Sequence, residues 1–565
     1  MSRAEAPLRL TRPNVHPCWR RQGKRTRKLQ GLEPLRPWPA RLAQRYRAAG
    51  YWRDQTLADW FTQCCAQEPD APALIDRAGT LSYGQMLQVV QQQAGQLRAL
   101  GILPGEIVLL QQSNQRGFAL ALLSLLWAGC VPLLALPGHG RHELNSWLAQ
   151  TGARVYWGEG RVPQLALPDG GIILGGADCP LLQHQAAAPL RTAAPSDPDG
   201  MALLLVSGGS TGTPKLIPRS HNDYLCCVRL SSQRCSIQAH HRYLCLLPCA
   251  HNFALSSPGL LGFWQAGACV VLSDEVMPRA QLQLLAQHLI THTALVPAQA
   301  LRWLHSISSE PRLAELSQGV HLQVGGAPLD EGTALALETR LGVRLQQVFG
   351  MAEGLLHYTD ASDSQALRTS TQGRPLCRLD EIRILGLDGT PVASGQPGEL
   401  CTQGPYTLRA YYPNPINPDA QQKAVASFTA DGWYRSGDWV RQLPSGHIQV
   451  LGRLKDQINR GGEKIDCAEV EGLLRGHPAV LDAALIGLSD PYLGEVACAC
   501  ISLKTPLTPL ASLADYLLGL GLARFKIPAR WVGFEQLPLT AVGKVDKTAL
   551  RRALPTNLTP STAYF

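Results

Sequence analysis

Short apolar runs alternate with segments of helical periodicity along most of the chain. Six runs rich in Val, Leu, Ile and Ala have the length and composition of buried strands, at 107–110, 131–136, 202–206, 268–272, 293–296 and 322–324. Between two of them, Leu282, Leu285, Ala286 and Leu289 recur on one face of a predicted helix. Such alternation is typical of α/β layers with largely parallel sheets, which is the fold class we expect.

The pattern changes towards the C-terminus. Residues 411–429 are rich in Pro, Asn and Gln, which predicts an exposed loop. A helix with Val470, Leu473 and Leu474 on its apolar face follows, within a segment that has the mixed pattern of a small α+β domain. Because 565 residues exceed one hydrophobic core, we expect a large N-terminal domain at 38–454 and a small mobile C-terminal domain at 455–565.

Charge alters this picture only at the N-terminus. The stretch up to Arg36 carries ten Lys or Arg and two acidic residues, so nearly all of the formal charge of +9 lies there. An arm for nucleic acid or a membrane surface is one interpretation. We favour a disordered extension at 1–37 and expect no nucleic-acid partner, because the remaining chain is close to neutral.

The cysteines and apolar runs favour a cytoplasmic protein. The sixteen cysteines include no Cys-x-x-Cys pair, and no cleavable apolar segment follows the start, so free thiols in a reducing compartment are expected. Gly129 and Pro132 interrupt the apolar run 118–136, which predicts a buried helix and a buried strand, not a membrane span.

A glycine- and hydroxyl-rich loop directly follows the predicted strand 202–206. Backbone N–H groups and hydroxyls in such a loop can wrap phosphate oxygens, and a lysine adds positive charge. Proline before that lysine separates the segment from a Walker loop. The loop consists of Ser207, Gly208, Gly209, Ser210, Thr211, Gly212, Thr213, Pro214 and Lys215.

The loop resembles the phosphate-binding signature of the adenylate-forming superfamily, and further signatures of that superfamily follow in order. They are Val348, Phe349, Gly350, Met351, Ala352 and Glu353; Gly398-Glu-Leu400; Tyr434-Arg-Ser-Gly-Asp438; Gly452-Arg453 with Lys455; and the segment from Pro538 to Lys544. The resemblance covers residues 38 to 553 and implies an enzyme that activates a carboxylate with ATP and Mg²⁺.

The resemblance also implies roles for individual residues. Glu353 would help to hold Mg²⁺, Asp438 would bind the ribose hydroxyls with Arg453 nearby, and Lys455 would be the hinge. Lys544 would bridge the carboxylate and the α-phosphate, while Lys215 and the loop would hold the β- and γ-phosphates. Gly326 and the residues from Val348 to Glu353 would complete the ATP site.

The segment Ala250-His-Asn-Phe-Ala-Leu-Ser-Ser-Pro-Gly259 is similar to one in stand-alone aryl acid ligases of siderophore pathways. It implies an acyl pocket shaped by His251, also a candidate catalytic residue, with Asn252 meeting an ortho hydroxyl. An amide and hydroxyls replace the aspartate that amino-acid-activating relatives use, which suits a hydroxybenzoic acid. Asn252 capping a local turn is the alternative. The pocket residues are His251, Asn252, Phe253, Ser257, Gly325, Gly326, Val348, Leu356 and Lys544.

Two positions disagree about the ring hydroxyls. Ser257 resembles 2,3-dihydroxybenzoate ligases, whereas Leu356 resembles the bulkier residue of salicylate ligases. A hydrogen-bond partner discriminates more strongly than one methylene, so 2,3-dihydroxybenzoate is favoured, with salicylate as the alternative.

The resemblance implies rotation of the small domain after adenylation and transfer of the aryl group to the phosphopantetheine of an aryl carrier protein of a non-ribosomal peptide synthetase. The chain has no carrier domain of its own, so we expect the acceptor to be a separate protein. We expect the enzyme itself to be a monomer or a homodimer. An aryl-CoA ligase that uses free coenzyme A would fit the same motifs, and so would a non-catalytic relative. The presence of Lys215, Glu353, Asp438, Arg453 and Lys544 opposes the non-catalytic relative.

Overall fold

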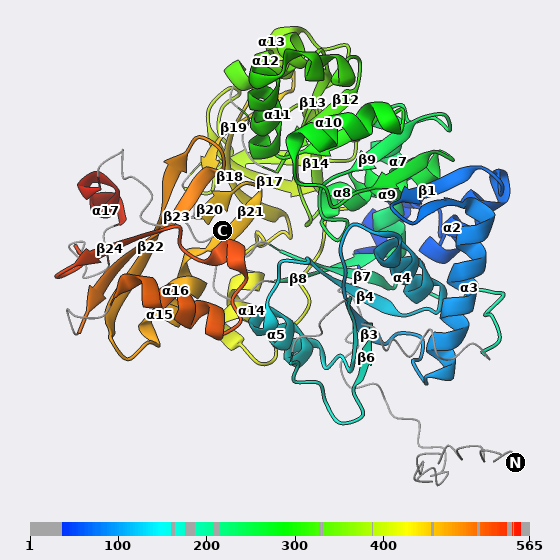
Figure 1. Ribbon diagram of the computed structural model, residues 1–565, viewed down its shortest axis with the longest axis horizontal. Coiled ribbons are helices and arrows are strands. Elements are labelled where there is room, and N and C mark those ends of the chain that lie inside the picture. The colour runs from blue at the N-terminus through cyan, green and yellow to red at the C-terminus, as the bar shows by residue number, and fades with distance from the viewer. Residues whose placement is uncertain are drawn as a thin grey trace, which may run out of the picture. The chain divides into compact units, whose positions relative to one another are not determined.

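Two sheets with mainly parallel strands form the centre of the large N-terminal domain in the computed structural model (Figure 1). The structure describes residues 37–159, 164–175, 187–207, 215–326, 329, 331–386, 388–453, 457–504, 509–538, 545 and 547–554. The basic extension predicted at 1–37 lies outside these residues, apart from Pro37. So do the loop residues 208–214, Lys455 and Lys544.

Sheet 1 has six strands in the order β6-β5-β3-β4-β7-β8, parallel except for β8. Its strands are β3 (Ile107–Gln111), β4 (Val131–Ala135), β5 (Val155–Trp157), β6 (Ile172–Leu174), β7 (Met201–Val206) and β8 (Leu216–Ser220).

Sheet 2 has nine strands in the order β15-β14-β13-β12-β11-β9-β10-β1-β2, and its pairings are parallel except β1/β2 at one edge and β13/β14 and β14/β15 at the other. Its strands are β1 (Pro72–Asp76), β2 (Gly79–Ser82), β9 (Arg242–Cys245), β10 (Cys269–Leu272), β11 (His292–Leu295), β12 (His321–Gly325), β13 (Arg344–Met351), β14 (Leu355–Tyr358) and β15 (Arg374–Pro375).

The central strands of both sheets are buried on both faces, and successive residues along each strand point to opposite faces. In β3, Val108 and Leu110 pack in a core between the sheets, whereas Leu109 packs with α5 (Arg141–Thr151). The core between the sheets is completed by α1 (Ala40–Ala48), α2 (Leu57–Gln67), α3 (Tyr83–Ala99), α4 (Arg116–Trp127), α7 (His221–Arg234), α8 (Asn252–Ser256) and α9 (Gly259–Gln265).

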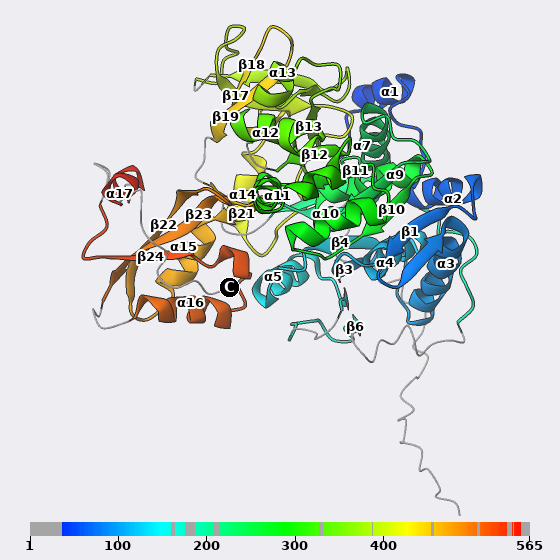
Figure 2. The same cartoon turned by 45° about the horizontal axis from the view of Figure 1, so that its top comes forward.

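A separate group of helices covers the outer face of sheet 2 (Figures 1 and 2). Leu285 and Trp303 from these helices pack on Leu322 of β12. The group consists of α10 (Pro278–Gln287), α11 (Pro297–Ser309), the 3₁₀-helix η1 (Pro311–Ser317) and α12 (Glu331–Leu341). No helix in the described part of the chain is long and apolar enough to cross a bilayer.

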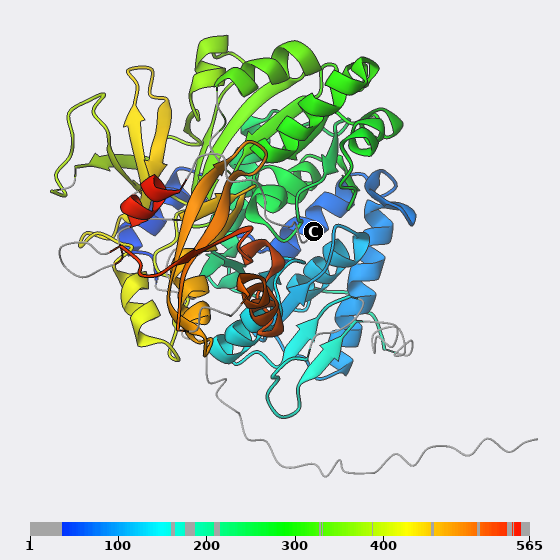
Figure 3. The same ribbon diagram turned by 60° about the vertical axis from the view of Figure 1, so that its left-hand side comes forward.

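Two further sheets are largely antiparallel. Sheet 3 comprises β16 (Glu381–Leu385), β17 (Gly398–Gln403), β18 (Tyr434–Gln442) and β19 (Ile448–Arg453), with α13 (Gln365–Ser370) preceding it. Sheet 4 belongs to the small C-terminal domain, orange to red in Figure 3, and comprises β20 (Gln457–Arg460), β21 (Glu463–Asp466), β22 (Val480–Asp490), β23 (Gly494–Leu503) and β24 (Arg530–Phe534). Its helices are α15 (Cys467–Arg475), α16 (Leu510–Gly519), η2 (Arg524–Lys526) and α17 (Lys547–Ala553).

The six predicted strands are confirmed as β3, β4, β7, β10, β11 and β12, and the helix with Val470 and Leu474 is α15. The run 118–136 folds as α4 followed by β4, as expected. The antiparallel sheet 3 was not anticipated. The cysteines in the described residues are free, and all but Cys377 are buried.

Two predictions were wrong in detail. Leu289 does not share the buried helix face, because α10 ends at Gln287 and Leu289 adopts a φ of 52° in the following turn, with 72% of its surface exposed. The region 411–429 is not simply an exposed loop: Tyr411 is buried, and α14 (Pro418–Val425) lies within it. Asn417 caps that helix and Pro418 occupies its first turn, so the Pro/Asn composition that predicted a loop marks a helix start instead.

Adjacent parallel strands also bring histidines together. His292 and His321 are paired in register at the starts of β11 and β12, with ring centroids 5.0 Å apart, and His241 lies 4.6 Å from His292. Burial is the main cause that lowers the pKa of His292, to about 2, and the neighbouring His321 and His241 add to the shift. These imidazoles are therefore neutral in the folded protein.

We expect acid to destabilise this cluster. Between pH 6.5 and the low folded pKa, the unfolded chain binds a proton at His292 that the folded chain does not, so the free energy of unfolding falls as pH decreases. His292→Asn should remove about 2 kcal/mol of the loss that the natural chain shows between pH 7 and pH 5. Urea titrations at both pH values measure this difference, and equal losses in both proteins would contradict it.

Candidate active site

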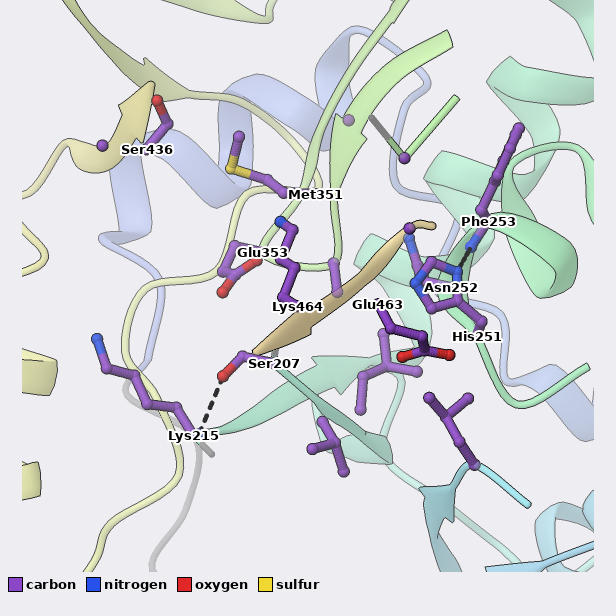
Figure 4. A pocket seen from close by; sticks show the side chains of 18 of the residues that line it. Ser207, Lys215, His251, Asn252, Phe253, Met351, Glu353, Ser436, Glu463 and Lys464 are labelled. Atoms are coloured by element: carbon purple, nitrogen blue, oxygen red, sulfur yellow. Dashed lines mark hydrogen bonds between the residues drawn. The ribbon is translucent and has the colours of Figure 1, made fainter. Parts of the chain in front are cut away.

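The site is a cavity at the carboxyl ends of parallel strands in both sheets, where ligands commonly bind in α/β folds. Its wall includes Leu134, Val206, Gly326 and Val348, at or next to the ends of β4, β7, β12 and β13. Figure 4 shows Ser207 and Lys215 on one side of the view and His251, Asn252 and Phe253 on the other.

Asn252 presents a hydrogen-bond donor to the cavity. Its side-chain oxygen accepts hydrogen bonds from the Tyr224 hydroxyl and from Ser256 Oγ, each 3.1 Å long. The amide nitrogen donates to no acceptor among the described residues. Because the amide oxygen is already engaged, the NH₂ group is the part available to a ligand oxygen. His251, not Asn252, caps α8, so the interpretation of Asn252 as a turn cap is wrong.

His251 caps α8 and faces the cavity as a neutral imidazole. Its Nδ1 accepts the N–H of Phe253 at 3.3 Å. The imidazole ring lines the cavity, and the surrounding residues enclose it within the site. This burial, together with the positive charge of Lys464, lowers the pKa of His251 to about 4. Close to pH 7, His251 therefore carries no charge.

Ser257, Phe253 and Leu356 also line this half of the cavity. Ser257 is almost fully buried, and its Oγ donates to the Asn252 carbonyl at 3.4 Å. Gly325 does not line the cavity, but its lack of a side chain lets Val348 and Phe253 approach it closely. A Cβ at this position would lie 2.5 Å from the Val348 carbonyl oxygen and 3.2 Å from the Phe253 ring. Any larger residue at 325 would displace the aromatic wall.

At the other half, the described ends of the glycine-rich loop are clamped together. Ser207 N–H donates to the Lys215 carbonyl, and Lys215 N–H donates to Ser207 Oγ, both at 2.9 Å. Lys215 Nζ donates to Ser427 Oγ at 2.7 Å and lies 4.4 Å from the centre of the Tyr411 ring. The clamp holds the lysine stem at the mouth of the loop.

Glu353 is buried beside this lysine. Its Oε1 accepts a hydrogen bond of 2.9 Å from the Tyr411 hydroxyl, which also lies 3.1 Å from the Tyr434 hydroxyl. Burial and Glu353 raise the pKa of Tyr411 well above its usual range, so the phenol keeps its proton. Glu353 Oε2 has no hydrogen-bond partner among the described residues.

Arg219 fixes the backbone that leads to Glu353. The fully buried guanidinium donates to Asp223 at 2.7 Å, to the Ala352 carbonyl at 2.8 Å and to the Tyr406 carbonyl at 2.9 Å. A guanidinium can make these three bonds in different directions at once, which a lysine cannot. Arg219 therefore ties β8 to the segments on both sides of the carboxylate.

Only some of the other predicted site residues line the cavity. Gly350, Met351 and Ala352 line the cavity, but Phe349 packs near His357, with ring centroids 5.7 Å apart. Asp438 is buried one residue beyond the lining Gly437 and is paired across sheet 3 with the backbone of Arg453. Gly208, Gly209, Ser210, Thr211, Gly212, Thr213, Lys455 and Lys544 lie outside the described residues.

The small domain contributes a wall for which the motifs implied no role. Gly462, Glu463 and Lys464, at the start of β21, line the cavity together with Phe525 and Lys526 (Figure 4). Burial raises the pKa of Glu463, with Lys526 and Arg460 opposing that shift. The only signal in the sequence was the Gly461-Gly462 pair, which predicts a tight turn but not the surface that it meets.

Comparison with known proteins agrees with this geometry. The profile of AMP-binding enzymes matches residues 61–412, and that of the AMP-binding enzyme C-terminal domain matches residues 469–544. The chain belongs to the AMP-binding enzyme family. These enzymes use ATP and Mg²⁺, and members of the family form acyl adenylates.

Relatives in this family are similar over nearly their whole length. The vibriobactin-specific 2,3-dihydroxybenzoate-AMP ligase of Vibrio cholerae is 44% identical and covers 92% of this chain and 98% of its own. The salicyl-AMP ligase / salicyl-S-ArCP synthetase of Mycobacterium tuberculosis is 40% identical, with coverages of 94% and 96%. The apo structure of MbtA from Mycobacterium smegmatis is 40% identical, with coverages of 92% and 99% and a TM-score of 0.70.

Arg219 offers a test of the frame around Glu353. Arg219→Met leaves Asp223 buried without its partner and two carbonyls without donors, so we expect a loss of about 3–5 kcal/mol in unfolding free energy. Arg154→Met is the matched control, because Arg154 makes a bidentate pair with Glu106 but is 32% exposed, and should cost about 1 kcal/mol or less. Guanidinium titrations compare the two; equal losses would show that Arg219 has no special structural role.

Proposed function

We propose that this enzyme converts 2,3-dihydroxybenzoate and ATP to the aryl adenylate and pyrophosphate, and then transfers the aryl group to the phosphopantetheine thiol of an aryl carrier protein in siderophore biosynthesis. Salicylate is the alternative substrate. The observation that carries the proposal is Asn252, whose oxygen is held by Tyr224 and Ser256 so that its NH₂ group faces the cavity.

The acyl half of the cavity suits a neutral hydroxylated ring. An NH₂ donor can meet an ortho hydroxyl oxygen, and Phe253, Val348 and Leu356 supply apolar walls. His251 is uncharged, so it adds polarity without a second positive charge beside the ring. A buried substrate hydroxyl needs such partners, because leaving it unpaired would cost binding energy.

The other half suits a nucleotide triphosphate with a metal ion. Lys215 would bind the β- and γ-phosphates with the glycine-rich loop, and Asp438 and Arg453 would hold the ribose. Glu353 would hold Mg²⁺ through Oε2, since Oε1 is taken by Tyr411 and carboxylate oxygens are the ligands that Mg²⁺ prefers. The ion would supply positive charge to the phosphates.

The first step is an attack by the substrate carboxylate on the α-phosphate. An acyl–phosphate bond forms and the bond to pyrophosphate breaks. The protein has to align two anionic groups and stabilise the charge that builds up, which is the work of Lys544 and Lys215 in this proposal. In the second step a thiol attacks the aryl carbonyl carbon, the thiol proton is lost, a C–S bond forms and AMP leaves.

The number of ring hydroxyls depends on Ser257 and Leu356. Ser257 Oγ is buried at the cavity wall, and its hydrogen bonds to described residues are long, 3.4 Å to the Asn252 carbonyl and 3.5 Å to Ser256 Oγ, which leaves it able to meet a 3-hydroxyl. Leu356 favours the smaller salicylate ring, and relatives with either substrate in their name are similar to this chain. The hydrogen-bonding position is given more weight because it discriminates more strongly.

Pyrophosphate exchange tests the proposed reaction. With benzoate, salicylate, 2,3-dihydroxybenzoate and a set of amino acids as substrates, 2,3-dihydroxybenzoate should give the highest kcat/KM and amino acids should give none. Asn252→Leu, which is similar in size and removes the donor, should lower the hydroxybenzoate rates by about tenfold or more and affect benzoate less. Exchange driven by amino acids alone would overturn the proposal.

Ser257→Cys tests the choice between the two hydroxybenzoates. A thiol is a weak hydrogen-bond partner, so the ratio of kcat/KM for 2,3-dihydroxybenzoate over salicylate should fall by about tenfold. Ser317→Cys, at a fully buried serine in η1, controls for general effects of the replacement. An unchanged ratio would mean that Ser257 does not contact the ring.

A further inference from the structure

The first turn of α5 holds a carboxylate that the proposed chemistry does not use. The side chain of Glu143 is fully buried, yet it does not line the cavity. Its Oε1 accepts the N–H of Ala523 at 3.1 Å and lies 3.2 Å from Lys526 Nζ, while its Oε2 accepts the N–H of Gly140 at 3.0 Å. Glu143 therefore joins the large domain to residues near η2 in the small domain.

Lys526 connects Glu143 to the part of the small domain that lines the cavity. Its ammonium also donates to both oxygens of Glu469, at 2.9 and 3.0 Å, and Glu469 lies in α15, directly after β21. Burial alone would lower the pKa of Lys526, but Glu469 and Glu143 raise it, so the amine is charged. Arg460 of β20 donates to the Phe525 carbonyl at 3.4 Å. The position of the β20–β21 hairpin is thus coupled to the position of η2.

The backbones also fit closely at this contact. His142 N–H donates to the Gly521 carbonyl, and Arg141 Nη2 donates to the Gly519 carbonyl, each at 3.3 Å. A Cβ on Gly140 would lie 1.9 Å from the Gly521 carbonyl oxygen. Gly140 has a φ of −91°, which any residue adopts, so the need for glycine comes from the contact and not from the local conformation.

We propose that residues 140–143 form a docking seat for residues 519–526, and that seating positions Glu463 and Lys464 in the cavity for transfer of the aryl group to the thiol. Glu143 and Gly140 are positioning residues for that step. The inference rests on the proposed function and on the rotation of the small domain between the two half-reactions, which the family resemblance implies. The seat contains none of the groups proposed for adenylation, so it should not be needed there.

The energetics of the contact suit a reversible seat. Burying an ion pair costs solvation that its attraction only roughly repays, so the net stabilisation is small, whereas leaving one partner buried alone is costly. When the two domains separate, Glu143 loses Lys526 and Ala523 as partners, whereas Lys526 keeps its ion pair with Glu469 in the small domain. The pair therefore selects one orientation of the small domain without holding it permanently.

Two different changes at the seat test the inference. Glu143→Gln keeps the size of the side chain but removes the charge opposite Lys526, and its single amide oxygen can replace only one of the two carboxylate oxygens that accept backbone N–H groups. Gly140→Ala inserts a methyl group against the Gly521 carbonyl. Gly519→Ala is the matched control, because a Cβ at that nearby position meets nothing within 4 Å.

Each variant is assayed for both half-reactions: pyrophosphate exchange for adenylation, and single-turnover transfer from preformed aryl adenylate to pantetheine. Gly140→Ala and Glu143→Gln should slow transfer by about tenfold or more and leave exchange within about twofold, and Gly519→Ala should match the natural chain in both. Retained exchange also shows that the variants are folded.

The outcomes separate the two proposals. If transfer is unchanged in both seat variants, or if exchange falls in parallel with transfer, the docking seat is wrong. If the natural chain itself shows no exchange with any hydroxybenzoate, the proposed function fails first.

Discussion

The central parallel strands of the large domain have to bury both of their faces, and the rest of the architecture follows from this constraint. Leu109 and Val108 of one strand already need separate cores on opposite sides of sheet 1. Helices therefore fill the space between the sheets and cover their outer faces. The carboxyl ends of the strands remain uncovered by these helices, and the cavity forms where the ends of both sheets and the β21 segment of the small domain come together.

Within that cavity, the two halves differ in charge because of what lies behind their walls. Lys215 and Glu353 share one aromatic partner, Tyr411. The Lys215 ammonium lies against the face of the Tyr411 ring, and the Glu353 carboxylate accepts a hydrogen bond from its hydroxyl. In the opposite half the large domain contributes uncharged groups: His251 is neutral, and Asn252 is oriented by hydroxyl donors behind it, while the charged Glu463 and Lys464 come from the small domain. A substrate with one carboxylate and a hydroxylated ring matches this division, since its charge faces the cationic half.

The buried charges of the large domain and those at the docking seat serve different ends. Arg219 and Asp223 lie within one domain, so their pairing is permanent and stabilises the backbone beside Glu353. Glu143 and Lys526 belong to different domains, and their pairing lasts only as long as the domains stay in contact. A buried ion pair thus makes the backbone rigid within the large domain, and at the docking seat it favours one orientation of the small domain.

The order of strands and helices, the motif positions and the context of Asn252 were accessible from the sequence, because period-two and period-3.6 patterns reflect local burial. The predictions for Leu289 and the 411–429 region were wrong, since exposure and capping at an element's end depend on where the chain turns. Orientation of the Asn252 amide by Tyr224, 28 residues away, could not be predicted. Still less could the Glu143 contact with Ala523, 380 residues apart, because spacing along the chain carries no information about which distant groups folding brings together. The sequence by itself therefore determined the elements and the chemistry available. Only the tertiary structure decided which polar atoms face the cavity and which part of the small domain closes it.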